Sequence, residues 1–127
     1  MNPTKDPTAS FLEDLAVQPT LPLLAHTSGS IRIDLDDGGE TSHWYLQVDR
    51  GSVKVTHRSG KADAVVRCQK KLFDQMCRGG ANATAAMLRG VLEVEGDLGL
   101  VSSLARLMPG PPKSVASYLE RQKEIAT

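Results

Sequence analysis

Three histidines are the side chains of this chain that titrate near neutral pH, and they lie far apart in the sequence. His26 precedes the first predicted strand, His43 begins a strand on its polar side, and His57 ends another. A histidine serves as a zinc ligand or general base when a second ligand or a carboxylate follows at a fixed spacing, as in an HExxH helix. No such spacing surrounds these three, so we expect solvated or structural histidines and predict no metal site.

The acidic residues allow two chemical interpretations, and each has a simpler alternative. The run from Asp34 to Gly38 looks like a calcium loop, but its glycine comes one position early and no glutamate stands at the closing position. A hairpin turn is the better interpretation. Glu93 and Glu95 share one face of a predicted strand and could act as an acid–base pair, yet alternating charges also suit the solvent side of an edge strand.

Motifs for nucleophilic catalysis and for phosphate binding are absent from the sequence. No glycine elbow surrounds Ser102 or Ser103, and no Walker or dinucleotide-binding pattern occurs. The chain is therefore predicted not to be an enzyme, to have no catalytic residue and to need no cofactor.

One dense positive spot remains. Lys70 and Lys71 precede Phe73, and Arg67, Arg78 and Arg89 are near in sequence. This spot is either the solvated start of a helix or an anchor for an anionic head group such as a carboxylate or phosphate.

Bulk composition narrows the class of protein. The chain has 127 residues, enough for one domain, and its 15 basic and 15 acidic residues cancel, which argues against nucleic acid as a partner. Cys68 and Cys77 lie among apolar neighbours, as expected of buried thiols in a reducing compartment. Neither a signal peptide core nor a membrane span is visible. These features predict a cytoplasmic protein.

Alternating apolar residues predict a sheet in the first half of the chain. Strands are expected over 30–36, 44–49, 53–56 and 63–68, joined by turns at Gly38-Gly39, Gly51 and Gly60. We expect them to form an antiparallel meander with one apolar face. Such a sheet needs a layer of helices to cover that face.

Helical stripes in the second half predict that layer. Helices are expected over 70–78, 82–89, 98–108 with Asp97 as its cap, and 114–125, with a fifth strand over 91–95. A short helix over 11–17 should also form, with Ser10 as N-cap and Glu13 completing a capping box. The fold class is therefore α+β, a five-stranded, mostly antiparallel sheet covered on one face by helices.

The helix over 98–108 is more apolar than its length requires. Its polar or small residues, Gly99, Ser102, Ser103 and Arg106, are confined to one narrow stripe. A helix on a sheet needs about a third of its surface apolar, so this one is expected to meet something besides the sheet. Either ordinary core packing against the last helix or an apolar ligand would satisfy it.

These elements together resemble the sterol carrier protein 2 domain. The residues that carry the resemblance are Ala62-Asp63, Phe73, Gly79 or Gly80, Asn82, Gly90 and Gly96-Asp97. It covers about residues 28–111, which leaves 1–27 as a lead-in with a short helix and 112–127 as a C-terminal helix packed on the same domain.

The resemblance implies an apolar tunnel between sheet and helices that binds and transfers a sterol, fatty acid, fatty acyl-CoA or similar lipid, such as a phospholipid, without chemical turnover. Its implied partners are such a lipid, transient contacts with a membrane or an enzyme, and a second copy in a homodimer. An interaction module with a solid core, or an accessory subunit of a lipid-metabolising enzyme, is the alternative. The implied tunnel residues are Trp44, Leu46, Phe73, Met76, Met87, Leu100, Leu104, Leu107 and Met108.

Overall fold

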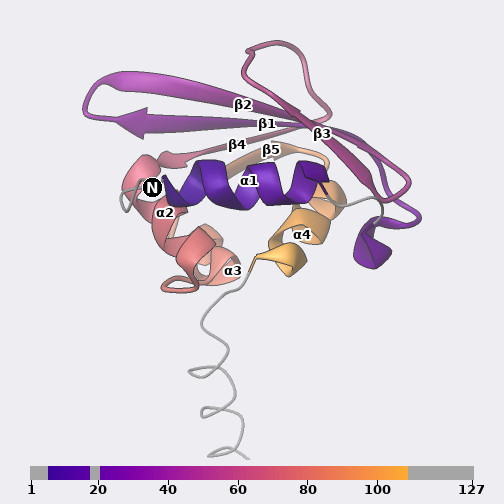
Figure 1. Cartoon of the computed structure of the whole chain (residues 1–127). Helices are drawn as coiled ribbons and strands as arrows, with labels where there is room; N and C mark the ends of the chain where they lie inside the picture. Colours follow the sequence, from indigo (N-terminus) through magenta and orange to yellow (C-terminus); the bar gives the residue numbers. More distant parts are fainter. Residues whose placement is uncertain (1–5, 18–20, 109–127) are drawn as a thin grey trace, which may run out of the picture.

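A computed structural model describes residues 6–17 and 21–108 of the chain. A five-stranded sheet forms one layer and the helices form a second layer on one of its faces (Figure 1). The elements, in chain order, are α1 (Pro7–Val17), the 3-10 helix η1 (Pro22–Leu24), β1 (Ser28–Asp37), β2 (Glu40–Asp49), β3 (Ser52–Thr56), β4 (Ala64–Gln69), α2 (Lys70–Arg78), α3 (Ala83–Leu88), β5 (Glu93–Gly96) and α4 (Leu98–Leu107). The predicted α+β class is confirmed.

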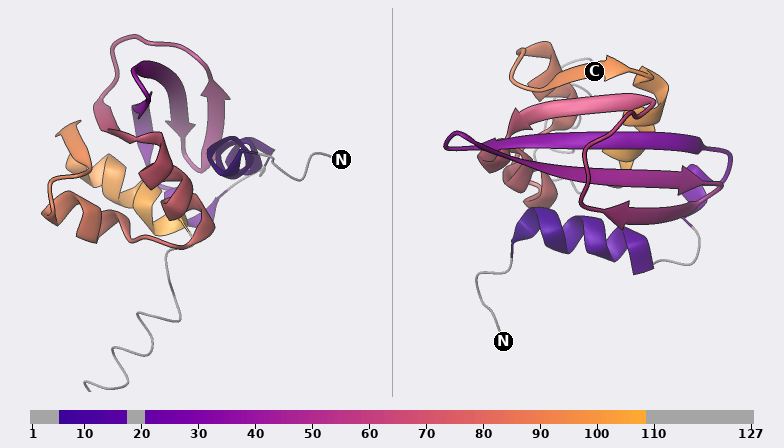
Figure 2. Two further views of the ribbon diagram at one scale, coloured as in Figure 1. Left: turned by 90° about the vertical axis from the view of Figure 1, so that its left-hand side faces the viewer. Right: turned by 90° about the horizontal axis from the view of Figure 1, so that it is seen from above.

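The sheet is mixed, and its strand order is β3-β2-β1-β4-β5. Three of its four pairings are antiparallel, but β4 pairs in parallel with β1. The expected four-stranded meander is therefore wrong in its last step. Residues 57–63 carry the chain across the sheet to the far side of β1, because a parallel partner cannot be reached through a tight turn (Figure 2).

Side chains on the outer face of the sheet hold this crossover. The hydroxyl of Tyr45 donates to the carbonyl of Lys61 at 3.0 Å, and Nη1 of Arg32 donates to the carbonyl of Gly60 at 2.8 Å. The helix-free face of the sheet is thus partly covered by the chain's own loop.

The core lies between the two layers. Ile31, Ile33 and Leu35 of β1 are buried, as their period of two predicted. The helices contribute Phe73 and Met76 from α2 and Leu100, Val101 and Leu104 from α4, so the predicted stripes on these helices face the sheet.

Helix boundaries differ from expectation at the amino-terminal end. Helix α1 begins at Pro7, so Ser10 lies inside it and the predicted capping box with Glu13 is wrong. Asp6 takes the capping role, because its Oδ1 accepts a hydrogen bond from the backbone N–H of Thr8 at 3.0 Å. The polar residues up to Ser10 predicted a loose lead-in, but Pro7 to Ser10 belong to α1.

The boundaries of the later helices lie within one or two residues of those predicted from the sequence. Asp97 caps α4 through a 3.1 Å bond from the backbone N–H of Leu100, as predicted. Strand β5 is displaced toward its end and covers Glu93–Gly96. The helix expected over 114–125 lies outside the described residues. Along the described part of the chain, no helix has both the length and the apolar content to cross a bilayer.

Candidate functional site

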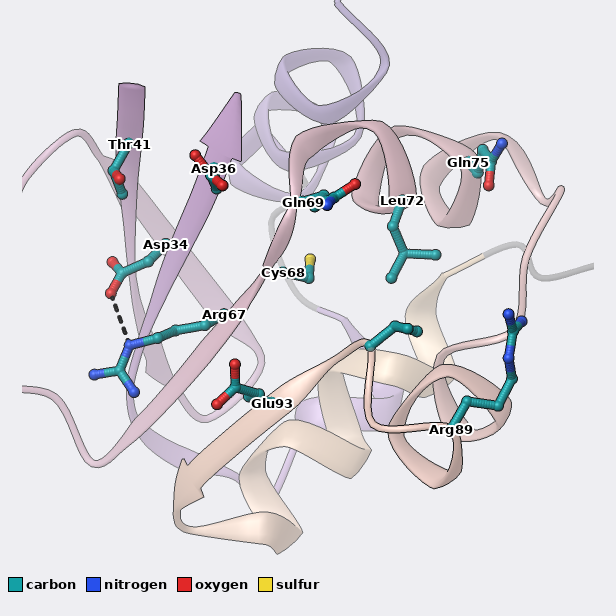
Figure 3. A pocket seen from close by; sticks show the side chains of 11 residues that line it. Asp34, Asp36, Thr41, Arg67, Cys68, Gln69, Leu72, Gln75, Arg89 and Glu93 are labelled. Atoms are coloured by element: carbon teal, nitrogen blue, oxygen red, sulfur yellow. Dashed lines mark ion pairs between the residues drawn. The ribbon is translucent and has the colours of Figure 1, made fainter. Parts of the chain in front are cut away.

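A pocket of about 690 Å³ opens where β4 runs on past Glu93, the first residue of the antiparallel β5. Strand β5 pairs with β4 from Ala64 to Arg67, so Cys68 and Gln69 of β4 have no strand beside them on that side. Helix α2 starts at Lys70 and forms a second wall. The segment between α3 and β5 forms the third (Figure 3). The mismatch in length between two neighbouring strands thus creates the pocket.

The pocket has a narrow apolar band and a charged surround. Cys68, Leu72 and Val91 make up the apolar part. The remaining described residues that line it are polar or charged: Asp34, Asp36, Thr41, Arg67, Gln69, Gln75, Arg89 and Glu93. In Figure 3, Cys68 and Leu72 point into the middle of the pocket, and Asp34 and Arg89 lie at opposite ends.

A row of charged side chains crosses the outer face of the sheet at one end of this pocket. Strand pairing places Glu93, Arg67, Asp34 and His43 side by side on β5, β4, β1 and β2. Oδ1 of Asp34 lies 2.7 Å from Nδ1 of His43, and its Oδ2 lies 3.6 Å from Nε of Arg67. The charges alternate, so each side chain faces an opposite or titratable neighbour.

Asp34 is the centre of this row. Nε of Arg32 donates to its Oδ1 at 3.0 Å, from the same strand. Burial alone would raise the pKa of Asp34, but the hydrogen bonds from His43 and Arg32, together with the charge of Arg32, lower it below its usual range. Asp34 therefore holds its negative charge and is committed to these partners.

Arg67 and Arg89 differ in whether their guanidinium groups already pair with a carboxylate of the described residues. Nη1 of Arg67 pairs with Oε1 of Glu95 at 3.0 Å, which raises the pKa of Arg67 and occupies its guanidinium. Arg89 is exposed and forms no ion pair with another residue of the described ranges 6–17 and 21–108. Gln75 lines the pocket at the same end (Figure 3). Arg89 is therefore the cation that a ligand in the pocket can reach.

The positive spot predicted at Lys70 and Lys71 is divided by the fold. Nζ of Lys70 is bound by Asp6 at 2.9 Å and by Asp74 at 3.0 Å, so its charge joins α1 to α2. Arg78 lines another pocket, of about 480 Å³, between α1 and α2. Of the basic residues near this spot, Arg67 and Arg89 line the 690 Å³ pocket, and an anionic anchor there stays a prediction.

Cys68 is the nucleophilic group of the pocket, and its surroundings suppress its reactivity. Burial raises the pKa of the Cys68 thiol to about 12. The thiol is therefore protonated at neutral pH and acts as an apolar surface atom. The arrangement can hold an apolar chain beside a cation, with no activated nucleophile or base beside it among the described lining residues.

The nine predicted tunnel residues are dispersed, and none of them lines the 690 Å³ pocket. Six are buried in the core: Trp44, Leu46, Phe73, Met76, Leu100 and Leu104. Met87 lines a space of about 200 Å³ between α3 and α4, Leu107 lines the 480 Å³ pocket, and Met108 packs half-buried against the core. Their contact with a ligand stays a prediction.

Sequence reasoning missed the Asp34–His43 pair, although a signal for it was present. A two-residue turn at Gly38-Gly39 sets Asp37 opposite Glu40, and counting back along both strands sets Asp34 opposite His43. The contributions of Arg67 and Cys68 had no such signal, because they depend on the parallel pairing of β4 with β1.

A family model and several curated relatives match this chain. Residues 12–109 match the model of the SCP-2 sterol transfer family. Hydroxysteroid dehydrogenase-like protein 2 of Xenopus laevis is 33% identical over 73 residues, which are 56% of this chain and 18% of that protein. The chain spans about a fifth of the length of the curated relatives it matches.

Solved structures share the fold. The sterol carrier protein domain 2 of Helicoverpa armigera matches with a TM-score of 0.66 at 20% identity, over 84% of this chain and 89% of that one. Palmitated SCP2L2 from Aedes aegypti matches with a TM-score of 0.61 at 16% identity, over 78% of this chain and 91% of that one. These likenesses show the same sheet and helical layer.

Proposed function

Because the chain belongs to the SCP-2 sterol transfer family, we propose that it binds a single-chain anionic lipid, a fatty acid or its coenzyme A thioester, without converting it. The carrying observation is the 690 Å³ pocket, whose apolar band of Cys68, Leu72 and Val91 leads to Arg89. Its volume lies in the range of small-molecule sites. The relative described as palmitated supports a fatty acyl ligand.

The charges of the pocket favour one orientation of the ligand. A carboxylate or phosphate next to Arg89 gains an ion pair, whereas at the opposite end it would meet Asp36 and Glu93. Arg89 is exposed, so this pair contributes little affinity in water. Each methylene group moved out of water contributes about 0.8 kcal/mol, so the acyl chain supplies most of the binding free energy. A neutral sterol would gain nothing from Arg89.

A second candidate function is that of a lipid-presenting domain that acts beside an enzyme. The favouring observation is that curated relatives, among them peroxisomal multifunctional enzyme A of Dictyostelium discoideum, are about five times as long as the stretch that matches. In this role the same pocket holds the lipid and passes it to a catalytic partner. A homodimer with a solid core is a further alternative, which measurement of mass in solution distinguishes.

Titration with palmitate and with the matching alcohol tests the proposal. The chain should take up palmitate, and Leu72→Trp, which fills the pocket, should weaken binding by about tenfold or more. Leu98→Trp is the matched control, since Leu98 is exposed at the start of α4 and outside the pocket. Arg89→Ala should weaken palmitate binding by about fivefold at most and leave the alcohol unchanged. Failure of the wild-type chain to take up either compound would contradict the proposal.

A further inference from the structure

The turn that ends α3 is fixed by its backbone. The N–H of Gly90 donates to the carbonyl of Met87 at 3.0 Å, and the N–H of Val91 donates to the carbonyl of Ala86 at 3.1 Å. This pair of bonds is a Schellman motif, and Gly90 supplies the left-handed conformation it needs with a φ of 77°. These bonds define the backbone conformation of the turn.

The apolar side chains around this turn are either buried or exposed. Ala86 and Leu92 are 3% and 4% exposed and anchor the turn to the core. Leu88 is 85% exposed and Val91 is 45% exposed, which makes Leu88 the most exposed large apolar side chain in the described part of the chain. This hydrogen-bonded turn thus presents two apolar side chains to the surroundings, and Leu88 is not among the residues packed against the core.

The charge beside these side chains is positive. Arg89 stands between Leu88 and Val91 in sequence and forms no ion pair with a described residue. Glu93 follows on β5 opposite Arg67, which also pairs with Glu95, so within the turn from Leu88 to Val91 the charged residue is Arg89. An apolar pair with one available guanidinium complements a surface that is anionic outside and apolar just beneath, which is the character of an anionic bilayer.

The turn also borders the pocket. Arg89 and Val91 both line it, while Leu88 does not. We infer that the Leu88–Val91 turn docks on anionic membrane surfaces, where Leu88 and Val91 enter the interfacial layer and Arg89 meets lipid phosphates. The inference rests on the proposed function, because a lipid carrier has to take its ligand from a bilayer. Docking by this turn brings the mouth of the pocket to the membrane surface.

Two apolar side chains and one arginine give weak, reversible binding. Such contact suits a carrier that must leave the membrane again after loading. The arginine contribution is screened by salt, whereas the leucine contribution is not.

Vesicle flotation of the full chain with two lipid compositions tests the inference. Binding to mixed phosphatidylcholine and phosphatidylglycerol vesicles should exceed binding to phosphatidylcholine alone, and added salt should reduce the difference. Leu88→Ser should lower the partition coefficient about tenfold. Leu98→Ser is the matched control, because Leu98 is 57% exposed at another site, and it should change the coefficient by less than about twofold.

The readouts separate this inference from the proposed function. Leu88→Ser should leave palmitate binding in solution unchanged, since Leu88 lies outside the pocket. If palmitate does not bind while Leu88-dependent vesicle binding persists, the proposed function fails and the docking surface stands. Equal losses for both leucine variants, no difference between the two vesicle compositions, or a Leu88-dependent dimer in light scattering without vesicle binding would overturn the docking surface.

Discussion

Oδ1 of Asp34 lies 2.7 Å from Nδ1 of His43, directly across the β1–β2 pair. Asp34 is 8% exposed, and its Oδ1 also accepts a hydrogen bond from Nε of Arg32 at 3.0 Å. Asp34→Asn removes the charge that these cationic and titratable neighbours face, so we expect a loss of about 1–3 kcal/mol in the free energy of unfolding. Urea denaturation measures it. Asp37→Asn on the exposed end of the same strand is the control, and equal midpoints for the two variants would contradict the role given to Asp34.

Stability should fall when the pH drops below about 4. Burial alone would raise the pKa of Asp34 and of Asp6, but hydrogen bonds from His43 and Arg32 to Asp34, and from Lys70 and Thr8 to Asp6, lower both below their usual range. A lowered folded-state pKa contributes stability that is complete above the unfolded-state pKa and is lost as the pH falls through the folded-state pKa.

Denaturation midpoints measured from pH 7 down to pH 3 test this expectation. The midpoint of the wild type should decline in the acid range, and Asp34→Asn should decline less because one of the two carboxylates is gone. Parallel declines for both proteins would show that Asp34 is not among the groups responsible.

Much of the fold could be predicted because its signals are local. Alternation along β1 and the Asp97 cap of α4 each depend on a few consecutive residues. The parallel partner of β1 could not be predicted in this way, because Ala64 and Ile31 are joined by no short turn. The hydrogen bond from Oγ1 of Thr8 to Oδ1 of Asp74, at 2.7 Å, likewise joins α1 to α2 at positions that no local sequence pattern relates.

The candidate site was the least predictable part for the same reason. Its lining comes from four strands, α2 and the segment after α3, and its opening depends on β5 starting only at Glu93, opposite Arg67, while β4 runs on to Gln69. An apolar stripe on a helix cannot distinguish a ligand wall from a core wall, and the predicted residues Phe73 and Leu104 are in the core. Arg89 was noted in the sequence, but its position on the pocket wall depends on how the segment after α3 folds back to β5.

The Cys68 thiol should react slowly and should report on the pocket. Burial raises its pKa to about 12, so its alkylation by iodoacetamide at pH 8 should be on the order of a thousandfold slower in the native than in the unfolded chain. The rate should climb with pH throughout the range in which the fold survives. Mass spectrometry of the Cys77→Ser variant isolates this thiol.

Adding palmitate to the thiol measurement tests whether the ligand occupies the pocket that Cys68 lines. If the acyl chain occupies the pocket, it should slow the alkylation of Cys68 further. Cys77 lines the other pocket beside α1, so in the Cys68→Ser variant palmitate should leave its rate unchanged. Equal protection of both thiols would point to a general stabilisation of the fold instead of occupancy of this pocket.

Gly96 should tolerate substitution far less than Gly90, although both have a positive φ, of 89° and 77°. A Cβ at Gly96 would collide with the carbonyl oxygen of Asp63, whereas a Cβ at Gly90 would meet nothing within 4 Å. Gly90→Ala should therefore cost about 1 kcal/mol from the left-handed backbone alone. Gly96→Ala should cost about 3 kcal/mol or more, because backbone on β4 has to move. Thermal and urea denaturation compare the two, and similar losses would mean that β5 yields more easily than its pairing with β4 suggests.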